Sequence, residues 1–369
     1  MIICMKYKVP NFVEWCRIPL LFRFGNHSMK KTPATLLISL GLFCWVMLGS
    51  NSFAAAEKIG KITGGVMHTA PAWFKESFLE IREDVDEATA ENKHVILFFQ
   101  LNACPYCDRM LSESFEAEPL TSYIQDHFDT IAINIRGDRD IVFNEETSLT
   151  EKELSEMLKV RGTPAILFLD SDNKTVVRVN GYRAPERFKK ILQYVNEKGY
   201  QQGSLAEYLE KNLADDVYKL RDNKLFTQLA DLSTINGPLA LIFEDSSCYD
   251  CAEFHENLLS RDDVQKELKP FTVVRLDADS EKTIIAVDGN KTTPKALAHQ
   301  YNMIFRPGVL MFDEGKLIRR YDSLLYSHHF KEGFRFVGGG YYKKEDYRSY
   351  SRKRTEELLS EGIDIDLGQ

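Results

Sequence analysis

Two Cys-x-x-C motifs that lie 144 residues apart place the strongest constraint on this chain of 369 residues. The same offset places the apolar run His94–Phe99 on Pro238–Phe243, and an offset one residue shorter places Thr163–Asp170 on Arg306–Asp313. A repeat of this length is far longer than the roughly 20–50 residues of a solenoid unit. The pattern therefore predicts two divergent copies of one globular domain, arranged in tandem.

Each copy is expected to contain strand, helix, strand, helix, hairpin and helix, in that order. In the first copy we predict a helix near 75–91, strands at 95–100 and 130–135, a helix from Cys104 limited by Pro119, a helix at 150–159, a hairpin of 165–169 and 175–179, and a helix at 185–196. In the second we predict strands at 239–243 and 271–276, a helix from Cys248, a helix at 294–301, a hairpin around 313–315 and a helix at 327–337. This order predicts an α/β fold with a central mixed sheet flanked by helices.

The predicted organisation has four segments. They are an N-terminal extension with a signal peptide (1–56), the first domain (70–200), the second domain with a connecting helix that starts at the capping box of Ser204 (204–340), and a C-terminal tail (341–369). The tail is rich in tyrosine and basic residues, and we expect it to be solvated and flexible apart from a short helix near 355–362. The alternative is that its tyrosines and cations dock an acidic partner or stack on a ligand.

The N-terminal segment has the order of a secretory signal. Lys30 and Lys31 precede the apolar run Ala34–Leu48, and the small residues Ala54–Ala56 follow. The run is shorter than the roughly 18 residues that span a bilayer, so we predict cleavage rather than anchoring and no stable membrane span afterwards. The start of translation is predicted at Met29, and the protein is predicted to be exported.

The positions of the cysteines and the balance of charges exclude several classes of function. Three of the seven cysteines, Cys4, Cys16 and Cys44, fall in the predicted leader, and the other four form the two motifs. The chain has 47 basic and 55 acidic residues, which argues against a nucleic-acid or anionic-membrane binder. Zinc usually needs four ligands, and each copy has only one cysteine pair, so no metal is predicted.

The chemistry is predicted to lie in the cysteine pairs. A helix N-terminus stabilises the thiolate of a cysteine placed there and lowers its pKa from about 8.5. Cys104 is therefore the expected exposed nucleophile, and Cys107, one turn later, the buried thiol that resolves a mixed disulfide. Thr163 and Pro164 precede an apolar strand, where a cis-proline would leave a backbone edge free for an extended substrate.

These residues carry a family resemblance. Cys104-Pro-Tyr-Cys107 with Gly162-Thr-Pro164 resembles the thioredoxin superfamily, and the string Trp73–Phe78 is similar to periplasmic thioredoxin-like proteins of the SoxW group. The resemblance implies two tandem thioredoxin-like domains. It also implies a redox pair at Cys104 and Cys107, a cis-proline loop at Thr163-Pro164, and no cofactor beyond the redox-active disulfides. In the second copy, Cys248, Cys251, Arg306 and Pro307 stand at the matching places.

The second copy departs from the family pattern. Thioredoxin has a buried aspartate six residues before its first cysteine, where this chain has Phe98 and Ile242, and no replacement base is obvious. Glu244, Asp245 and Asp250 place negative charge around Cys248 and are expected to weaken its reactivity, unless Arg306 lies close enough to oppose them. Cys104 is therefore predicted to be more reactive than Cys248. A static or regulatory disulfide between Cys248 and Cys251 remains an alternative to a redox-active pair.

The resulting prediction is a periplasmic bacterial thiol–disulfide reductase that acts on disulfide-containing proteins. Its second domain would relay electrons or bind substrate, and a membrane protein of the DsbD type is the electron donor that the resemblance implies. The alternatives are a disulfide oxidase or isomerase, or a non-catalytic binding and assembly module.

Overall fold

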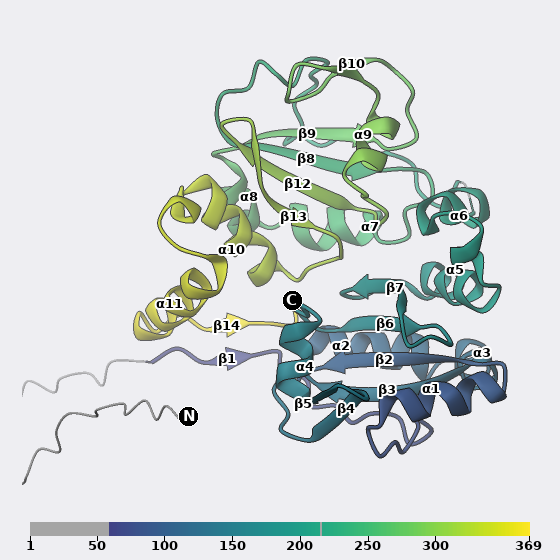
Figure 1. The fold of residues 1–369 in the computed structure, drawn as a ribbon. Helices are drawn as coiled ribbons and strands as arrows, with labels where there is room; N and C mark the ends of the chain where they lie inside the picture. The colour runs from purple at the N-terminus through teal and green to yellow at the C-terminus, as the bar shows by residue number, and fades with distance from the viewer. Residues whose placement is uncertain (1–58, 215) are drawn as a thin grey trace, which may run out of the picture. The chain divides into compact units, whose positions relative to one another are not determined.

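The computed structural model describes residues 59–214 and 216–369 (Figure 1). The predicted signal peptide, the start at Met29 and the three N-terminal cysteines lie outside the described residues. Within these two ranges, none of the helices combines the length and the apolar character needed to cross a bilayer.

The first copy contains a four-stranded mixed sheet. Its strands are β2 (His94–Gln100), β3 (Phe128–Asn134), β6 (Ala165–Leu169) and β7 (Thr175–Asn180), in the order β3-β2-β6-β7. Strand β2 pairs parallel with β3 and antiparallel with β6, and β6 pairs antiparallel with β7. Because side chains alternate along β2, Phe98 enters the core on one face of the sheet and Phe99 the core on the other.

Helices cover both faces of this sheet. One core includes side chains of α2 (Pro105–Met110), the π-helix η1 (Leu111–Phe115), α3 (Leu120–His127) and α5 (Pro185–Asn196). The other includes side chains of α1 (Ile81–Ala90) and α4 (Glu151–Met157), with the hairpin of β4 (Asp140–Asn144) and β5 (Thr147–Thr150) beside it.

The second copy repeats the arrangement. Its sheet has the order β9-β8-β12-β13, built from β8 (Leu239–Glu244), β9 (Thr272–Asp277), β12 (Gly308–Asp313) and β13 (Lys316–Tyr321). One core draws on η3 (Phe254–Leu259), which continues α7 (Cys251–Glu253), and on α8 (Asp262–Leu268) and α10 (Ser327–Gly338). The other draws on α9 (Pro294–Gln300) and β10 (Ile284–Ile285), which pairs with β11 (Lys291–Thr292). The predicted α/β class, with a mixed sheet flanked by helices in each copy, is confirmed.

The first helix begins at Ile81, not near residue 75 as predicted. The backbone N–H of Lys75 donates to the carbonyl of Thr130 at 2.8 Å and so ties the preceding segment to β3. Leu79 has a φ of 65°, which no α-helix accommodates, and its N–H donates to Ser77 Oγ at 2.7 Å.

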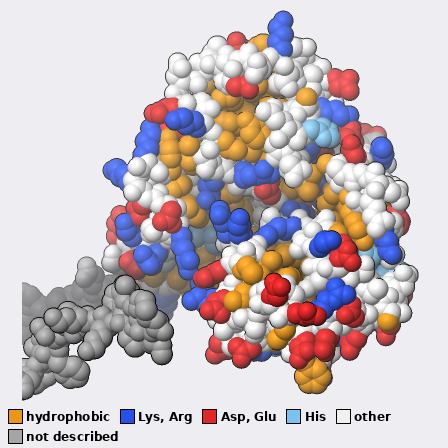
Figure 2. All heavy atoms as spheres, in the orientation of Figure 1, with side chains coloured by type: hydrophobic (Ala, Val, Ile, Leu, Met, Phe, Trp, Pro, Cys, Tyr) orange, Lys and Arg blue, Asp and Glu red, His pale blue; other side chains and the backbone are white. Residues whose placement is uncertain are grey.

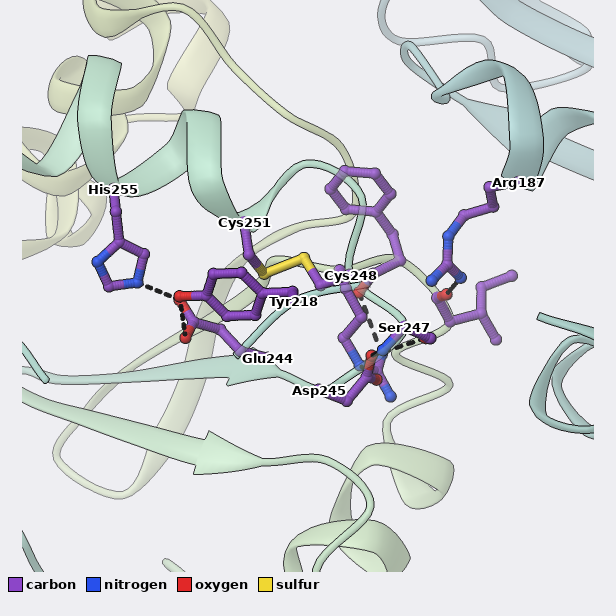
Figure 3. The surroundings of a disulfide bond; sticks show 11 residues. Arg187, Tyr218, Glu244, Asp245, Ser247, Cys248, Cys251 and His255 are labelled. Carbon is purple, nitrogen blue, oxygen red and sulfur yellow. Dashed lines mark hydrogen bonds and ion pairs between the residues drawn. A yellow bond between two sulfur atoms is a disulfide. The ribbon is translucent and has the colours of Figure 1, made fainter. Parts of the chain in front are cut away.

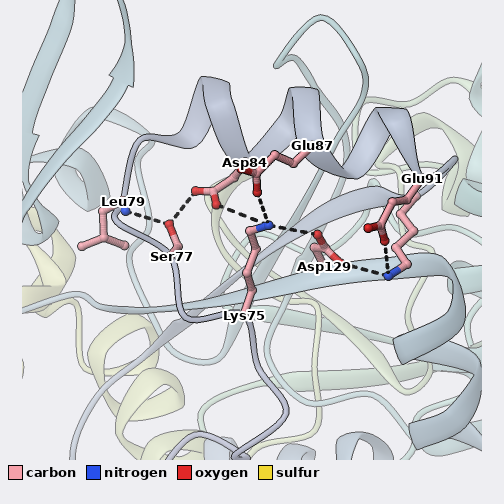
Figure 4. A network of polar contacts seen from close by, with 8 residues as sticks. Lys75, Ser77, Leu79, Asp84, Glu87, Glu91 and Asp129 are labelled. Carbon is pink, nitrogen blue, oxygen red and sulfur yellow. Dashed lines mark hydrogen bonds and ion pairs between the residues drawn. The ribbon is translucent and has the colours of Figure 1, made fainter.

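A polar network joins this extended segment to α1 and β3 (Figure 4). Lys75 Nζ lies 2.7 Å from Glu87 Oε2 and 3.3 Å from Asp129 Oδ2. Burial alone would lower the pKa of Lys75, but the hydrogen bond to Glu87 and the charge of Asp129 raise it above its ordinary value. The ammonium therefore stays charged and holds helix and strand together.

Two other helix predictions need correction. The helix α3 at Leu120–His127 was not predicted, because Pro119 reads as a helix limit and also precedes a new helix directly. In the second copy the helix begins at Cys251 and not at Cys248, since residues 245–250 form an irregular turn after β8.

The C-terminal segment is ordered rather than flexible. Helix α11 (Tyr347–Ser360) starts at Asp346, whose carboxylate accepts hydrogen bonds from two backbone N–H groups of the first turn. Tyr350 is buried and packs on Phe336 of α10. The last strand, β14 (Ile365–Asp366), pairs parallel with β1 (Ile62–Thr63). The tyrosines predicted to be solvated thus form part of the second core. The connecting helix α6 (Leu205–Asn212) begins at Ser204 with the predicted capping box.

Acidic side chains gather over α1 and the β4–β5 hairpin (Figure 2). Glu83, Asp86 and Glu87 of α1 are all exposed there. This face repels polyanions, in line with the charge argument from the sequence.

Candidate active site at two disulfides

Both Cys-x-x-C motifs form disulfide bonds, at matching places in the two copies. Cys104 and Cys107 have Cα atoms 5.3 Å apart, and Cys248 and Cys251 have Cα atoms 5.5 Å apart. Each pair follows the central strand of its sheet, β2 or β8. All four cysteines are buried: Cys104 is 6% exposed, Cys248 1%, and Cys107 and Cys251 0%. Cys104 is thus the most accessible of the four, but less exposed than expected.

Cys104 occupies the N-cap of α2. Its Sγ accepts a hydrogen bond from the backbone N–H of Cys107 at 3.1 Å, and Pro105 stands at the first helical position. Thr163 Oγ1 donates to the same sulfur at 3.3 Å. The N-terminus of α2 and the Thr163 hydroxyl therefore both present partial positive charge to the Cys104 sulfur. This arrangement stabilises a thiolate.

The two prolines predicted beside the cysteines are both preceded by cis peptide bonds, at Thr163-Pro164 and Arg306-Pro307. In the first copy this loop brings Thr163 to the Cys104 sulfur. In the second, Arg306 turns to Asp245, with 2.5 Å between Nε and Oδ2. Arg306 thus lies close enough to offset the negative charge of Asp245.

The second pair lacks the helix N-terminus that serves Cys104. Cys248 precedes α7 by three residues, and its backbone N–H donates to the Asp245 carbonyl at 3.2 Å. Asp250, 5% exposed, stands between the two cysteines. Burial raises the pKa of Asp250 to about 6, although Arg109 and Arg187 oppose the shift. These features agree with a less reactive Cys248.

An open pocket adjoins the second pair. Ser247 and Arg306 line it on the side of the disulfide. Arg187 of α5 also lines it and donates to the Ile304 carbonyl at 2.7 Å. The pocket therefore lies beside the first cysteine and the cis-proline loop of the second copy, where an extended substrate would be expected. Across residues 59–214 and 216–369, no group of three or more His, Cys, Asp or Glu side chains is arranged to hold a metal ion.

A buried polar group beside the second disulfide was missed at the level of sequence (Figure 3). Glu244, the last residue of β8, is 0% exposed, and its Oε1 lies 2.7 Å from His255 Nε2. Tyr218 donates its hydroxyl to Glu244 Oε2 at 3.4 Å and shares a buried cluster with Cys248 and Cys251. Glu244 was considered only as a nearby negative charge, whereas the structure makes it the paired carboxylate that the sequence appeared to lack.

The helices that follow the two disulfides contact each other. Arg109 and Glu253 occupy matching places in the two copies, and the guanidinium binds the carboxylate through two hydrogen bonds of 2.9 Å each. Tyr106, between the first pair of cysteines, accepts a hydrogen bond from the Tyr326 N–H at 2.8 Å. The hydroxyl also lies 3.0 Å from His329 Nδ1.

His328 and His329 lie in the first turn of α10. Burial lowers the pKa of both to about 4, so His329 is neutral near pH 7 and can accept a hydrogen bond from the Tyr106 hydroxyl. The surface around the first disulfide is therefore partly covered by residues of the second copy.

A double-mutant cycle on Arg109→Gln and Glu253→Gln is expected to give a coupling energy of about 1–2 kcal/mol. The pair is bidentate and partly shielded, whereas exposed pairs contribute roughly 0.2–1 kcal/mol. Urea unfolding of the wild type, the two single variants and the double variant measures this coupling energy. The exposed pair Arg82–Asp86 on α1 is the control. A coupling energy no larger than that of the control would contradict the proposed contact.

Comparisons with known proteins show the family to which the chain belongs. A family model described as "Thioredoxin-like domain" matches residues 81–196 and 225–338. The thiol:disulfide interchange protein DsbD of Photorhabdus laumondii is 29% identical over 117 residues, which are 31% of this chain and 19% of that protein. The chain thus matches about a fifth of the length of this curated relative.

Two solved structures are each similar to about a third of this chain. A thioredoxin-fold protein from Helicobacter pylori has 27% identity, a TM-score of 0.29, and coverage of 32% of this chain and 79% of that one. A thioredoxin from Thermus thermophilus has 24% identity and a TM-score of 0.28, with coverage of 34% and 90%.

Proposed function

Because the chain belongs to the thioredoxin-like domain family, we propose that it is a thiol–disulfide oxidoreductase in which Cys104 is the nucleophile and Cys107 the resolving thiol. The observation that carries the proposal is the Cys104 sulfur at the start of α2, with two hydrogen-bond donors aimed at it. Both donors stabilise negative charge on the sulfur, and a thiolate is the form that attacks disulfides.

One round of exchange starts from the reduced Cys104–Cys107 pair, which supplies both electrons, and the proposed electron donor must reduce the pair again before the next round. The Cys104 thiolate attacks a substrate disulfide, forms a mixed disulfide and releases one substrate thiolate. Cys107 then attacks Cys104, which frees the second substrate thiol and restores the Cys104–Cys107 bond. The edge beside Pro164 is the proposed binding place for an extended substrate segment, with Thr163 next to the reacting sulfur.

We propose that the net direction is reduction of protein disulfides in an exported protein. The relative named as a thiol:disulfide interchange protein supports disulfide exchange as the chemistry, and a DsbD-type membrane protein is the proposed electron donor. The signal-like N-terminal segment supports export to the periplasm.

The second copy is proposed to relay electrons to or from the first. The contact between the two active-site helices supports a transfer within one chain. Cys248, which is 1% exposed, also favours a second candidate role, a disulfide that stays closed during turnover.

Reduction of insulin disulfides by the wild-type chain, Cys104→Ser and Cys248→Ser tests the proposal. We expect activity to be lost with Cys104→Ser, and to be reduced with Cys248→Ser if the second pair relays electrons. A reduction potential of about −270 mV for the Cys104–Cys107 pair would support a reductase, and one of about −120 mV would support an oxidase. A wild-type chain without activity would refute the proposal that the protein is an oxidoreductase and would favour a non-catalytic binding module.

A further inference from the structure

The contact between the two copies is reciprocal. Arg187 and His329 are each the third residue of the helix that closes their copy, α5 in the first and α10 in the second. Arg187 donates to the carbonyl of Ile304 at 2.7 Å, next to the cis-proline loop of the second copy. His329 Nδ1 lies 3.0 Å from the hydroxyl of Tyr106, between the cysteines of the first copy. Each copy thus uses the same position to contact the surroundings of the other's disulfide.

Residues 323–329 of the second copy, here named the cover, lie against the first active site. The Tyr326 ring stacks on the Tyr106 ring with 4.5 Å between centroids and 28° between planes. At the other end of the cover, a Cβ added to Gly181 would lie 2.4 Å from Ser323 Oγ, so the two backbones approach closely. With the cover in this place, Cys104 is 6% exposed.

The cover also lies next to the proposed substrate edge. The N–H of Gly181 donates to the carbonyl of Pro164 at 2.7 Å, so the residue that Ser323 contacts is bonded directly to the cis-proline loop. A folded protein that presents a disulfide to Cys104 needs the surface around the sulfur, part of which the cover occupies. A small disulfide needs much less of that surface.

The copies are joined by contacts that can separate. The buried hydrophobic clusters of the described residues each belong to one copy: those of the first draw on residues 70–213 and those of the second on residues 218–350. The contacts between the copies include an ion pair, hydrogen bonds, a ring stack and an arginine over a ring. Domains that share no large apolar interface are expected to move relative to each other.

We propose that the second copy is an autoinhibitory cover of the first: the closed chain keeps folded proteins from Cys104 and admits small disulfides, and the copies separate before a protein disulfide reacts. This inference rests on the proposed function and adds a control over which disulfides reach the nucleophile. Because only the open chain binds a protein substrate, the apparent rate with that substrate is lowered by the open fraction.

The test uses the full chain with Cys248→Ser and Cys251→Ser, reduced beforehand, so that a single turnover reports on the first pair. Two variants of the second copy loosen the contact and leave the first copy unchanged. Glu253→Arg places a guanidinium against that of Arg109, and Tyr326→Ala removes the stacked ring. Oxidation of Cys104 by insulin and by hydroxyethyl disulfide is followed by acid quench and alkylation, with peptide mass spectrometry.

The matched control is Glu256→Arg. It makes the same change of charge in the same helix, but its partner, Arg221, belongs to the second copy.

We expect Glu253→Arg to speed oxidation by insulin about 10-fold, because about 1.4 kcal/mol of lost contact energy shifts the ratio of open to closed chains tenfold. Tyr326→Ala should act in the same direction, and the two changes together should act more strongly than either alone. The rate with hydroxyethyl disulfide should stay that of the parent in every variant. Glu256→Arg should change neither rate.

The failures of the two proposals are distinguishable. A parent chain whose Cys104 is oxidised by neither disulfide would refute the proposed oxidoreductase. A parent that reacts, with variants that leave the insulin rate unchanged or raise both rates equally, would refute the cover alone. Urea unfolding confirms that each variant is folded, and Tyr326→Ala, which introduces no charge, decides the outcome if Glu253→Arg does not fold.

Discussion

Replacing Cys107 by serine is expected to stop turnover and to leave the substrate attached to Cys104. The first attack needs only the Cys104 thiolate, which the N–H of residue 107 and the Thr163 hydroxyl still stabilise. The second attack needs the missing thiol. The rate of insulin reduction should fall at least about 100-fold, since loss of one member of a catalytic unit removes most of its effect.

Non-reducing electrophoresis and peptide mass spectrometry after incubation with an oxidised protein measure the adduct. Cys104→Ser is the matched control and should trap nothing, while Cys107→Ser combined with Cys248→Ser should trap as much as Cys107→Ser alone. An adduct found on Cys248 instead of Cys104 would reverse the assignment of the nucleophile.

Asp250→Asn is expected to stabilise the protein at neutral pH. Burial raises the pKa of Asp250 from 3.8 to about 6, so the folded state binds its proton more tightly than the unfolded state does. Stability from this residue is present below pH 4 and is lost as the pH rises through 6. Asparagine cannot ionise, so the variant does not lose this stability. Its free energy of unfolding is expected to exceed that of the wild type by about 3 kcal/mol at pH 7.5 and by about 1 kcal/mol at pH 4.5.

Urea unfolding of the wild type and the variant at the two pH values measures this difference. Asp262→Asn, at the exposed start of α8, is a suitable control and should show no such gain at pH 7.5. A variant that is less stable than the wild type at pH 7.5 would show that the charged form of Asp250 is favoured in the folded protein.

Elements with strong local signals could be predicted to the residue. Strand β6 matches its predicted range because Ala165–Leu169 is a continuous apolar run between a proline and a turn. Helix α5 matches because Pro185 opens it and Phe188, Ile191, Leu192 and Val195 keep one face apolar. Helix α11 was not predicted at its full length because it depends on contacts with the rest of the second copy: Tyr350 packs on Phe336 and donates its hydroxyl to Glu332.

The same distinction holds for the site. Cys104, Cys107 and the Thr163-Pro164 loop were predicted because their spacing and position after a strand carry the chemistry. Glu244 stands at the end of a strand, where a carboxylate usually reaches solvent. Its burial follows from Tyr218 and His255, which approach from two other segments, and only a position-by-position comparison of the copies could have shown that the three belong together.

The pairing of β1 with β14 gives the molecule a mechanical property. The strands run parallel, with Ile62 opposite Ile365 and Thr63 opposite Asp366. A pulling force applied through residues 59 and 369 would therefore load this pair lengthwise, in shear, so that its hydrogen bonds must break together rather than one after another. Tension would reach the sheets that hold the disulfides only after this clamp has ruptured, and stretching in an optical trap would record it as the first event.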